Sequence, residues 1–300
     1  MNSEYNKAFN TYLRGKDLSM SNRHYMDNLA ADEPDSFTVP EDFQDNFKKA
    51  LEKDCVFRRR GTVIEATEST GAIQTVVSTA VAEFVDEGDP IPEGSDQFTK
   101  LTFSSYKAGS IAKLSNTFID DMHFDVEKYL QKDFARRFGR CEEKVFIQGT
   151  GTGEPKGIIN SAEVGAVMLD DQIDYDDLFE LYFSVEPEFR KNGSWLMSDA
   201  TAVYLSTLKD DTGAYLLQEN DTLLGKPVEI SDFMDEAFPV AFGDFSYYWI
   251  IQRVPLSIKT LTELYANSHM TGYIGHERLD GKLIRSDAIK LLAAEEPEDE

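Results

Sequence analysis

Residues 141–158 read CEEKVFIQGTGTGEPKGI, and they join a helical pattern to a glycine-rich segment. Before the glycines, apolar side chains recur every three to four positions, at Val126, Leu130, Phe134, Phe138, Cys141 and Val145. This spacing places an apolar stripe along one helix face. It predicts a helix over residues 124–147, about 36 Å long at 1.5 Å per residue, with Asp120 or Asp121 as its N-cap. The glycines after residue 148 end it.

The segment GTGTGEPKG at residues 149–157 raises the alternative of a phosphate-binding loop. Such a loop follows a strand, ends in Gly-Lys-Ser/Thr and precedes a helix, so that backbone amides and the lysine converge on the phosphate. Here a helix comes first, Pro155 interrupts any helix that follows, and Gly157 stands after Lys156. The sequence therefore argues against nucleotide binding.

Other catalytic or metal-binding patterns are missing from the sequence. The histidines at positions 24, 123, 269 and 276 fit no ligand spacing, and the chain has no nucleophile elbow. Acidic pairs such as Asp176–Asp177 are interpreted as helix caps or solvated faces. Cys55 and Cys141 lack the neighbours of a zinc site, and we expect both to be buried thiols. We predict no catalytic residue, no cofactor, no metal and no enzyme activity.

Upstream, residues 62–115 are rich in Thr, Val, Ser and Gly, which is typical of strands and hairpins. Within them lies EFVDEGDPIPEGSDQF at residues 83–98. Its glycines and prolines interrupt regular structure, and its six acids between Glu83 and Asp96 oppose burial. The pattern predicts a long, exposed, two-stranded excursion.

The first 36 residues show little apolar periodicity and end in the turn-prone ADEPDS, so we expect an extended arm with one short helix near residues 5–13. Residues 1–26 carry four bases and two acids, a net charge of +2, whereas the whole chain carries −25. A basic arm could attract the acidic body of a neighbouring copy. The alternative is a chance distribution of charge over the surface.

The rest of the chain indicates a separate α+β unit and further strands. Residues 158–251 alternate helical and strand patterns, and residues 254–293 return to strands. The ending EEPEDE is a solvated acidic tail. The 300 residues contain 41% hydrophobic residues, which suits a globular protein, and no apolar run reaches the roughly 18 residues of a membrane span. A net charge of −25 argues against tight binding to nucleic acid.

The order of these elements resembles the major capsid proteins of tailed bacteriophages, which have the Hong Kong ninety-seven fold. The resemblance runs nearly end to end, and the glycine-rich motif with Glu154, Pro155 and Gly157 is its most specific part. The other segments that carry it are SEYNKAFNTYLRG, FTVPEDF, AEFVDEGDPIPEGSDQF, KLSNTFIDD, WLMSDATAVYLSTLKDDTGAYLLQ, LLGKPVEIS, AFGDFSYYWI and DAIKLLA.

The resemblance implies an α+β capsid fold whose domains can be laid on this sequence. Residues 1–36 would be the N-terminal arm, 60–115 the extended loop called the E-loop, and 158–251 the axial A-domain. Residues 37–59, 116–157 and 252–293 would form the peripheral P-domain, with residues 124–147 as its spine helix, and 294–300 the acidic tail. Some relatives carry a scaffolding segment before the arm. This chain opens directly on the arm, so it would be either a processed form or one assembled on a separate scaffold.

The implied function is self-assembly into pentamers and hexamers of an icosahedral head that encloses double-stranded DNA without specific binding. The protein would be located in the virion, after assembly in the host bacterial cytoplasm. Its partners would be other copies of itself, with scaffold, maturation protease and portal proteins, and no membrane. The residues expected at contacts between subunits are Lys7, Arg14, Lys16, Arg23, Glu87, Asp89, Pro90, Pro92, Glu93 and Lys100. The alternatives are an encapsulin-like compartment shell, which shares the fold, and a hydrolase with a convergent site.

Overall fold

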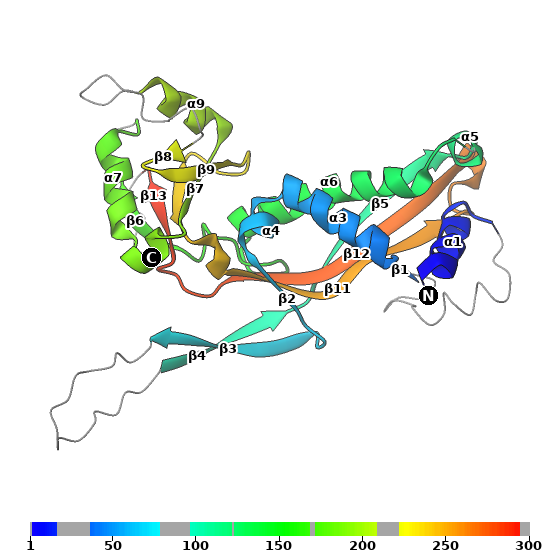
Figure 1. Ribbon diagram of the computed structural model, residues 1–300, viewed down its shortest axis with the longest axis horizontal. Coiled ribbons are helices and arrows are strands. Elements are labelled where there is room, and N and C mark those ends of the chain that lie inside the picture. The colour runs from blue at the N-terminus through cyan, green and yellow to red at the C-terminus, as the bar shows by residue number, and fades with distance from the viewer. Residues whose placement is uncertain are drawn as a thin grey trace, which may run out of the picture.

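Two β-sheets of very different length organise the chain (Figure 1). The computed structural model describes residues 2–16, 37–78, 97–121, 123–168, 172–208 and 222–294. The longer sheet and its helices form an elongated unit, and the shorter, wider sheet forms a compact unit at one end. A separate hairpin projects from the side of the molecule. The architecture is α+β, as the sequence predicts.

The elongated unit is built on two antiparallel strands, β11 (Tyr248–Leu261) and β12 (Met270–Leu283). Each has 14 residues, about 46 Å at 3.3 Å per residue. The strand β5 (Tyr106–Ser115) pairs with β12, while β1 (Phe37–Thr38) and β2 (Thr62–Glu65) pair with β11. Short helices close the ends of this unit: α4 (Val56–Arg60), α5 (Asn116–Asp120) and η2 (Ala266–Ser268).

Two helices, α6 (Val126–Gln148) and α3 (Glu41–Asp54), run along one face of this sheet (Figure 1). Helix α6 buries the first four residues of the predicted stripe, Val126, Leu130, Phe134 and Phe138, whereas Val145 is half-buried and Cys141 is exposed. The Phe47 and Phe138 rings meet edge to face with centroids 6.3 Å apart. The N-cap of α6 was predicted wrongly. Asp125 caps it by accepting a hydrogen bond from the Lys128 amide, because residues 116–120 already form α5.

The first helix corrects the expectation of a loose arm. Helix α1 (Asn2–Leu13) packs on the elongated unit with Tyr5, Phe9 and Leu13 buried in the same core as α3 and α6. The Tyr273 hydroxyl donates to the Leu13 carbonyl oxygen at 2.6 Å. The helix expected near residues 5–13 is therefore confirmed, whereas the sequence analysis did not predict that its apolar residues, four positions apart on one face, pack against the body. Residues 17–36 lie outside the described residues.

The compact unit contains a six-stranded sheet in the order β6-β13-β10-β7-β9-β8. The helices α7 (Tyr175–Ser184), α8 (Pro187–Arg190) and α9 (Asp199–Thr207) surround it, and η1 (Phe245–Tyr247) leads into β11. Its strands are β6 (Glu163–Val167), β7 (Ser194–Met197), β8 (Thr222–Leu223), β9 (Lys226–Ile230), β10 (Val240–Gly243) and β13 (Ile289–Ala293).

The position of β13 differs from the expected domain boundaries. Residues 252–293 were assigned to one unit, but β13 pairs with β6 and β10 in the compact unit. Leu291 and Leu292 are buried there on opposite faces of the sheet. A short apolar strand can complete either sheet, so its sequence alone does not determine which one it joins.

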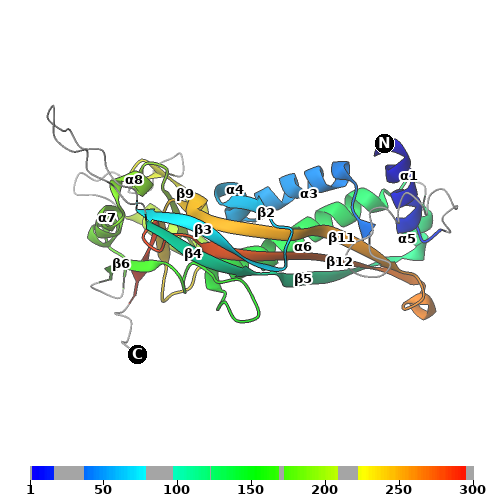
Figure 2. The ribbon, with the colours of Figure 1, turned by 90° about the horizontal axis from the view of Figure 1, so that it is seen from below.

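The projecting hairpin consists of β3 (Thr70–Ser78) and β4 (Gln97–Ser104), which pair only with each other among the described strands. It confirms the predicted two-stranded excursion but is shorter than residues 60–115. Strands β2 and β5, at the ends of that range, belong to the sheet of the elongated unit. Figure 2 shows the hairpin in front of the body, seen from below. Residues 79–96 lie outside the described residues.

None of the described helices is both long and apolar enough to cross a membrane.

Candidate assembly site at the hairpin junction

The glycine-rich segment is a tight turn that folds back on the end of α6. The Gly157 amide donates to the Gly149 carbonyl oxygen at 2.9 Å, and the Ile158 amide donates to that of Phe146 at 2.8 Å. A Cβ atom on Gly157 would lie 2.4 Å from the Ile147 carbonyl oxygen, so only glycine fits there. The turn therefore locks the helix end against the start of the compact unit.

Within this turn, the Glu154 carboxylate accepts the hydrogen bonds that a bound phosphate would accept in a phosphate-binding loop. Its Oε1 atom accepts from the Thr150 amide at 3.0 Å and from the Thr150 hydroxyl at 3.2 Å. A carboxylate already engaged by the loop amide opposes the approach of another anion. The geometry agrees with the sequence argument against nucleotide binding.

Next to the turn lies a buried charge cluster that the sequence analysis missed. The Arg58 Nε and Nη2 atoms donate to the Glu142 carboxylate at 2.8 and 2.6 Å, and Nη1 donates to the Gln252 amide oxygen at 3.4 Å. Burial alone lowers the pKa of Arg58, but Glu142 raises it above its ordinary value. In the sequence, the only sign of this cluster is the run RRR in α4 and the pair EE in α6, which lie next to apolar residues. Charged side chains that are buried with such neighbours need partners of opposite charge.

A second carboxylate, Glu277 on β12, enters the same cluster. It is completely buried, and its Oε2 atom lies 3.8 Å from Arg58 Nη2. Neither of its oxygens accepts a hydrogen bond from any described residue. Burial, and then the Glu142 charge, raise the pKa of Glu277 well above its ordinary value. One guanidinium thus faces two carboxyl groups, which favours a neutral Glu277.

The base of the hairpin is anchored to the body beside this cluster. The Asp280 Oδ2 atom accepts from the Ser104 amide at 2.8 Å, and the Ala66 amide donates to the Gln252 carbonyl oxygen at 2.9 Å. Gln252 therefore contacts both Arg58 and the segment that leads from β2 into the hairpin. The hairpin leaves the body at two points held by β11 and β12.

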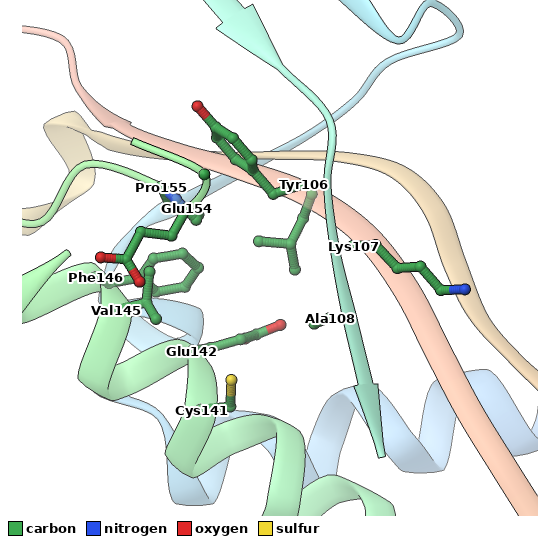
Figure 3. A pocket seen from close by; sticks show the side chains of 11 residues that line it. Tyr106, Lys107, Ala108, Cys141, Glu142, Val145, Phe146, Glu154 and Pro155 are labelled. Carbon is green, nitrogen blue, oxygen red and sulfur yellow. The ribbon is translucent and has the colours of Figure 1, made fainter. Parts of the chain in front are cut away.

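A cavity of about 210 Å³ opens between α6, β5 and the glycine-rich turn (Figure 3). Its walls are mainly apolar, and Figure 3 shows Cys141 and Glu142 pointing toward it from α6, while Lys107 points away. Burial, followed by the Glu142 charge, raises the pKa of the Cys141 thiol, which disfavours a nucleophilic thiolate. The residues that line the cavity are Tyr106, Lys107, Ala108, Cys141, Glu142, Val145, Phe146, Gly153, Glu154, Pro155 and Leu279.

The expectation for the two cysteines is half wrong. Cys55 is buried, but Cys141 is exposed on α6 because its helix position lies at the mouth of this cavity. No group of acidic, histidine and cysteine side chains suited to a metal occurs among the described residues.

The expected subunit contacts fall into three groups. Lys7, Lys16 and Lys100 are exposed. Arg14 is used inside the subunit, because its guanidinium donates to the carbonyl oxygens of Ile119 at 2.6 Å and Phe124 at 2.9 Å. The docking of α1 brings it there, and its expected role between copies stays a prediction. The remaining residues lie outside the described part: Arg23, Glu87, Asp89, Pro90, Pro92 and Glu93.

Comparison with known proteins decides the family. Residues 35–294 match the phage capsid family. The chain belongs to this family. It is therefore a structural protein, a major capsid protein that forms an icosahedral viral shell, and it is not an enzyme. No curated protein sequence matches it.

Solved structures from a GTA particle and from phages share the fold. The capsid of an empty GTA particle, computed with C5 symmetry, has a TM-score of 0.70 and 23% identity over 81% of this chain and 90% of that one. A chain from Microbacterium phage Oxtober96 has a TM-score of 0.62 and 17% identity over 93% of this chain and 100% of that one. A chain from Mycobacterium phage Bobi has a TM-score of 0.58 and 12% identity, covering 81% and 91%.

Proposed function

We propose that this capsid protein forms pentameric and hexameric rings in which each hairpin lies over a neighbouring copy. The observation that carries this proposal is the isolation of β3 and β4 from both sheets. A two-stranded ribbon is marginally stable by itself in water, so further contacts are needed to hold it. In a shell, the body of the adjacent subunit supplies them.

In this arrangement the compact unit is the axial domain around each ring, and the elongated unit is the peripheral domain. The exposed Lys7, Lys16 and Lys100 remain candidates for contacts between copies. The acidic residues Glu87, Asp89 and Glu93, which lie outside the described residues, are their proposed partners. Ring formation from identical copies requires different surfaces to meet at each contact. Flexible contacts then tolerate the slightly different angles of pentamers and hexamers.

The shell is proposed to enclose double-stranded DNA without binding it tightly. The chain carries a net charge of −25, which repels phosphates over roughly one Debye length, about 8 Å at physiological salt. Assembly in the bacterial cytoplasm with separate scaffold, protease and portal proteins completes the proposal. Binding of linear duplex DNA by purified subunits at physiological salt, measured by fluorescence anisotropy, would contradict the repulsive role of the charge.

The assembly role is tested by removing the hairpin. A variant in which a short turn replaces residues 70–103 keeps Glu65, Ser104 and Asp280, so we expect the body to fold. Electron microscopy of the purified full-length protein should show rings or closed shells, whereas the variant should show no closed shells. Closed shells from the folded variant would refute the role of the hairpin.

A further inference from the structure

Two carboxyl groups lie beside the cavity between α6, β5 and the glycine-rich turn. The strand register pairs Glu277 of β12 with Ala108 of β5, and Leu279 with Tyr106. Directly paired residues of neighbouring strands point to the same face of a sheet. The Glu277 side chain therefore lies on the face that carries the lining residues Ala108 and Leu279. Figure 3 shows Glu142 pointing toward the cavity from the α6 side.

The charges around these two carboxyl groups do not balance. One guanidinium, that of Arg58, faces both Glu142 and Glu277. Its hydrogen bonds go to Glu142 and Gln252, and no donor among the described residues reaches either oxygen of the completely buried Glu277. A buried carboxylate without a partner is costly. The site therefore either keeps a proton on Glu277 or accepts one more cation.

The rest of the cavity suits an apolar group. Val145, Phe146 and Pro155 form its walls together with Leu279. Its volume of about 210 Å³ exceeds that of an engineered apolar cavity of roughly 150 Å³ that binds benzene. Cys141 is exposed at its mouth, so a molecule can enter from solvent. An ammonium group on a small apolar body would match both the acidic side and the apolar remainder.

We propose that this cavity binds a small organic ammonium ion, whose apolar body lies against α6 and the turn and whose ammonium group lies beside Glu142 and Glu277. On binding, the ligand takes the place of the Glu277 proton, which passes to solvent. The ligand contacts α6, β5 and the turn at once, so its binding should raise the thermal midpoint of the subunit. This site does not depend on the proposed ring assembly.

The titratable groups around the site give the direction of a pH effect. Burial, and then the Glu142 charge, raise the pKa of Glu277 well above its ordinary value. Burial also raises the pKa of the Cys141 thiol, so the thiol stays neutral. The cation competes with a proton for Glu277, and its affinity should therefore rise with pH. The other titratable groups beside the site are Arg58 on α4, Glu154 in the turn and Tyr106 on β5.

The first test compares three ligands by isothermal titration calorimetry of the full-length protein at physiological salt. Benzyl alcohol has the size of benzylamine without its charge, and methylammonium has the charge without the apolar body. Benzylamine should bind at least about tenfold more tightly than either. Its affinity should rise from pH 6 to pH 8, with release of a proton, whereas that of benzyl alcohol should stay constant. Methylammonium reports any general attraction of cations to the net charge of −25.

Variants then locate the acidic partner. Glu277→Gln keeps the shape of the neutral acid, so the variant should fold and bind benzyl alcohol as the wild type does. It should bind benzylamine about tenfold more weakly than the wild type, without the rise with pH. Glu127→Gln is the matched control, because burial also raises the pKa of Glu127, which lies near the opposite end of α6. Binding of both ligands should be unchanged in this control.

The reactivity of Cys141 locates the ligand in the cavity. Cys141 points toward the cavity (Figure 3), whereas Cys55, the other cysteine of the chain, is buried. Bound benzylamine should slow the reaction of Cys141 with an uncharged maleimide. Ala108→Leu fills the cavity from β5, so this variant should lose both the protection of Cys141 and the binding of benzylamine.

The proposal is overturned if the wild type binds benzylamine no better than benzyl alcohol or methylammonium, or does not bind it at all. It is also overturned if Glu277→Gln binds benzylamine as tightly as the wild type, or if bound benzylamine leaves Cys141 unprotected. None of these results bears on the proposed shell function, which electron microscopy of the protein without any ligand tests separately.

Discussion

Arg58 on α4 and Glu142 on α6 form a bidentate ion pair in the interior, with nitrogen–oxygen distances of 2.8 and 2.6 Å. The side chains are 5% and 2% exposed. Through Gln252 and Glu277 the pair also contacts both long strands, next to the points where the hairpin leaves the body. The cluster therefore joins α6, the long sheet and the hairpin base.

Loss of the Arg58 guanidinium should destabilise the subunit strongly. Arg58→Met leaves the Glu142 carboxylate buried without its partner, which costs about 3–5 kcal/mol in the free energy of unfolding. Urea unfolding measures this change. Arg59→Met is the control, because Arg59 is 41% exposed and its pairing with Glu229 is partly solvated. Replacing both partners, as Arg58→Met with Glu142→Leu, should recover most of the loss; a double variant no better than the single one contradicts this account.

Glu277 should make the subunit less stable as pH rises. Its pKa is raised in the folded state by burial and by Glu142. The folded protein therefore holds a proton that the unfolded chain releases above about pH 4.5. Between that pH and the raised folded pKa, stability falls by up to about 1.4 kcal/mol per pH unit for this one group.

The comparison of wild type with Glu277→Gln isolates this effect. Glutamine resembles the neutral acid, so the variant should lose less stability between pH 5 and pH 8 in urea unfolding. Glu143 and Asp280 also have raised pKa values, and they change the free energy of unfolding with pH equally in both proteins. The groups that face Glu277 are Arg58, Glu142 and, on the exposed side of α6, Cys141. Equal slopes for the two proteins would mean that Glu277 is ionised in the folded state.

The first helix should contribute to stability as well as to assembly. Phe9, on α1, is fully buried, and its ring meets that of Phe43, on α3, edge to face with centroids 6.1 Å apart. Phe9→Ala should cost about 3–5 kcal/mol, as expected for a large buried side chain. The exposed Lys7→Ala on the same helix should change stability by less than about 0.5 kcal/mol. Similar thermal midpoints for wild type and Phe9→Ala would show that α1 is detached in solution.

Two glycines of the turn after α6 should respond differently to substitution. Gly157→Ala places a Cβ atom 2.4 Å from the Ile147 carbonyl oxygen and should prevent the turn from closing. Gly153→Ala meets no atom within 4 Å, although its φ of +77° is unfavourable for alanine. We expect a loss of about 1–2 kcal/mol for Gly153→Ala, the cost of a left-handed residue, and a larger loss for Gly157→Ala. The order of the two thermal midpoints checks this, and the reverse order would refute it.

The sequence by itself determined the long helix, the hairpin and the α+β class, because each depends on local spacing. The stripe of Val126, Leu130, Phe134 and Phe138 is buried in the structure, and Asp177, interpreted as part of a helix cap, takes part in the capping box of α7. Glycines and prolines also marked where the regular segments end. The order of these segments then carried the resemblance to capsid proteins.

Only the tertiary structure decided which sheet β13 joins, where α1 packs, and that Arg58, Glu142 and Glu277 share one site. These residues are far apart in the chain, and their meeting depends on strand register and helix docking. The physical reason is that periodicity reports which face of an element is buried, but not against which partner.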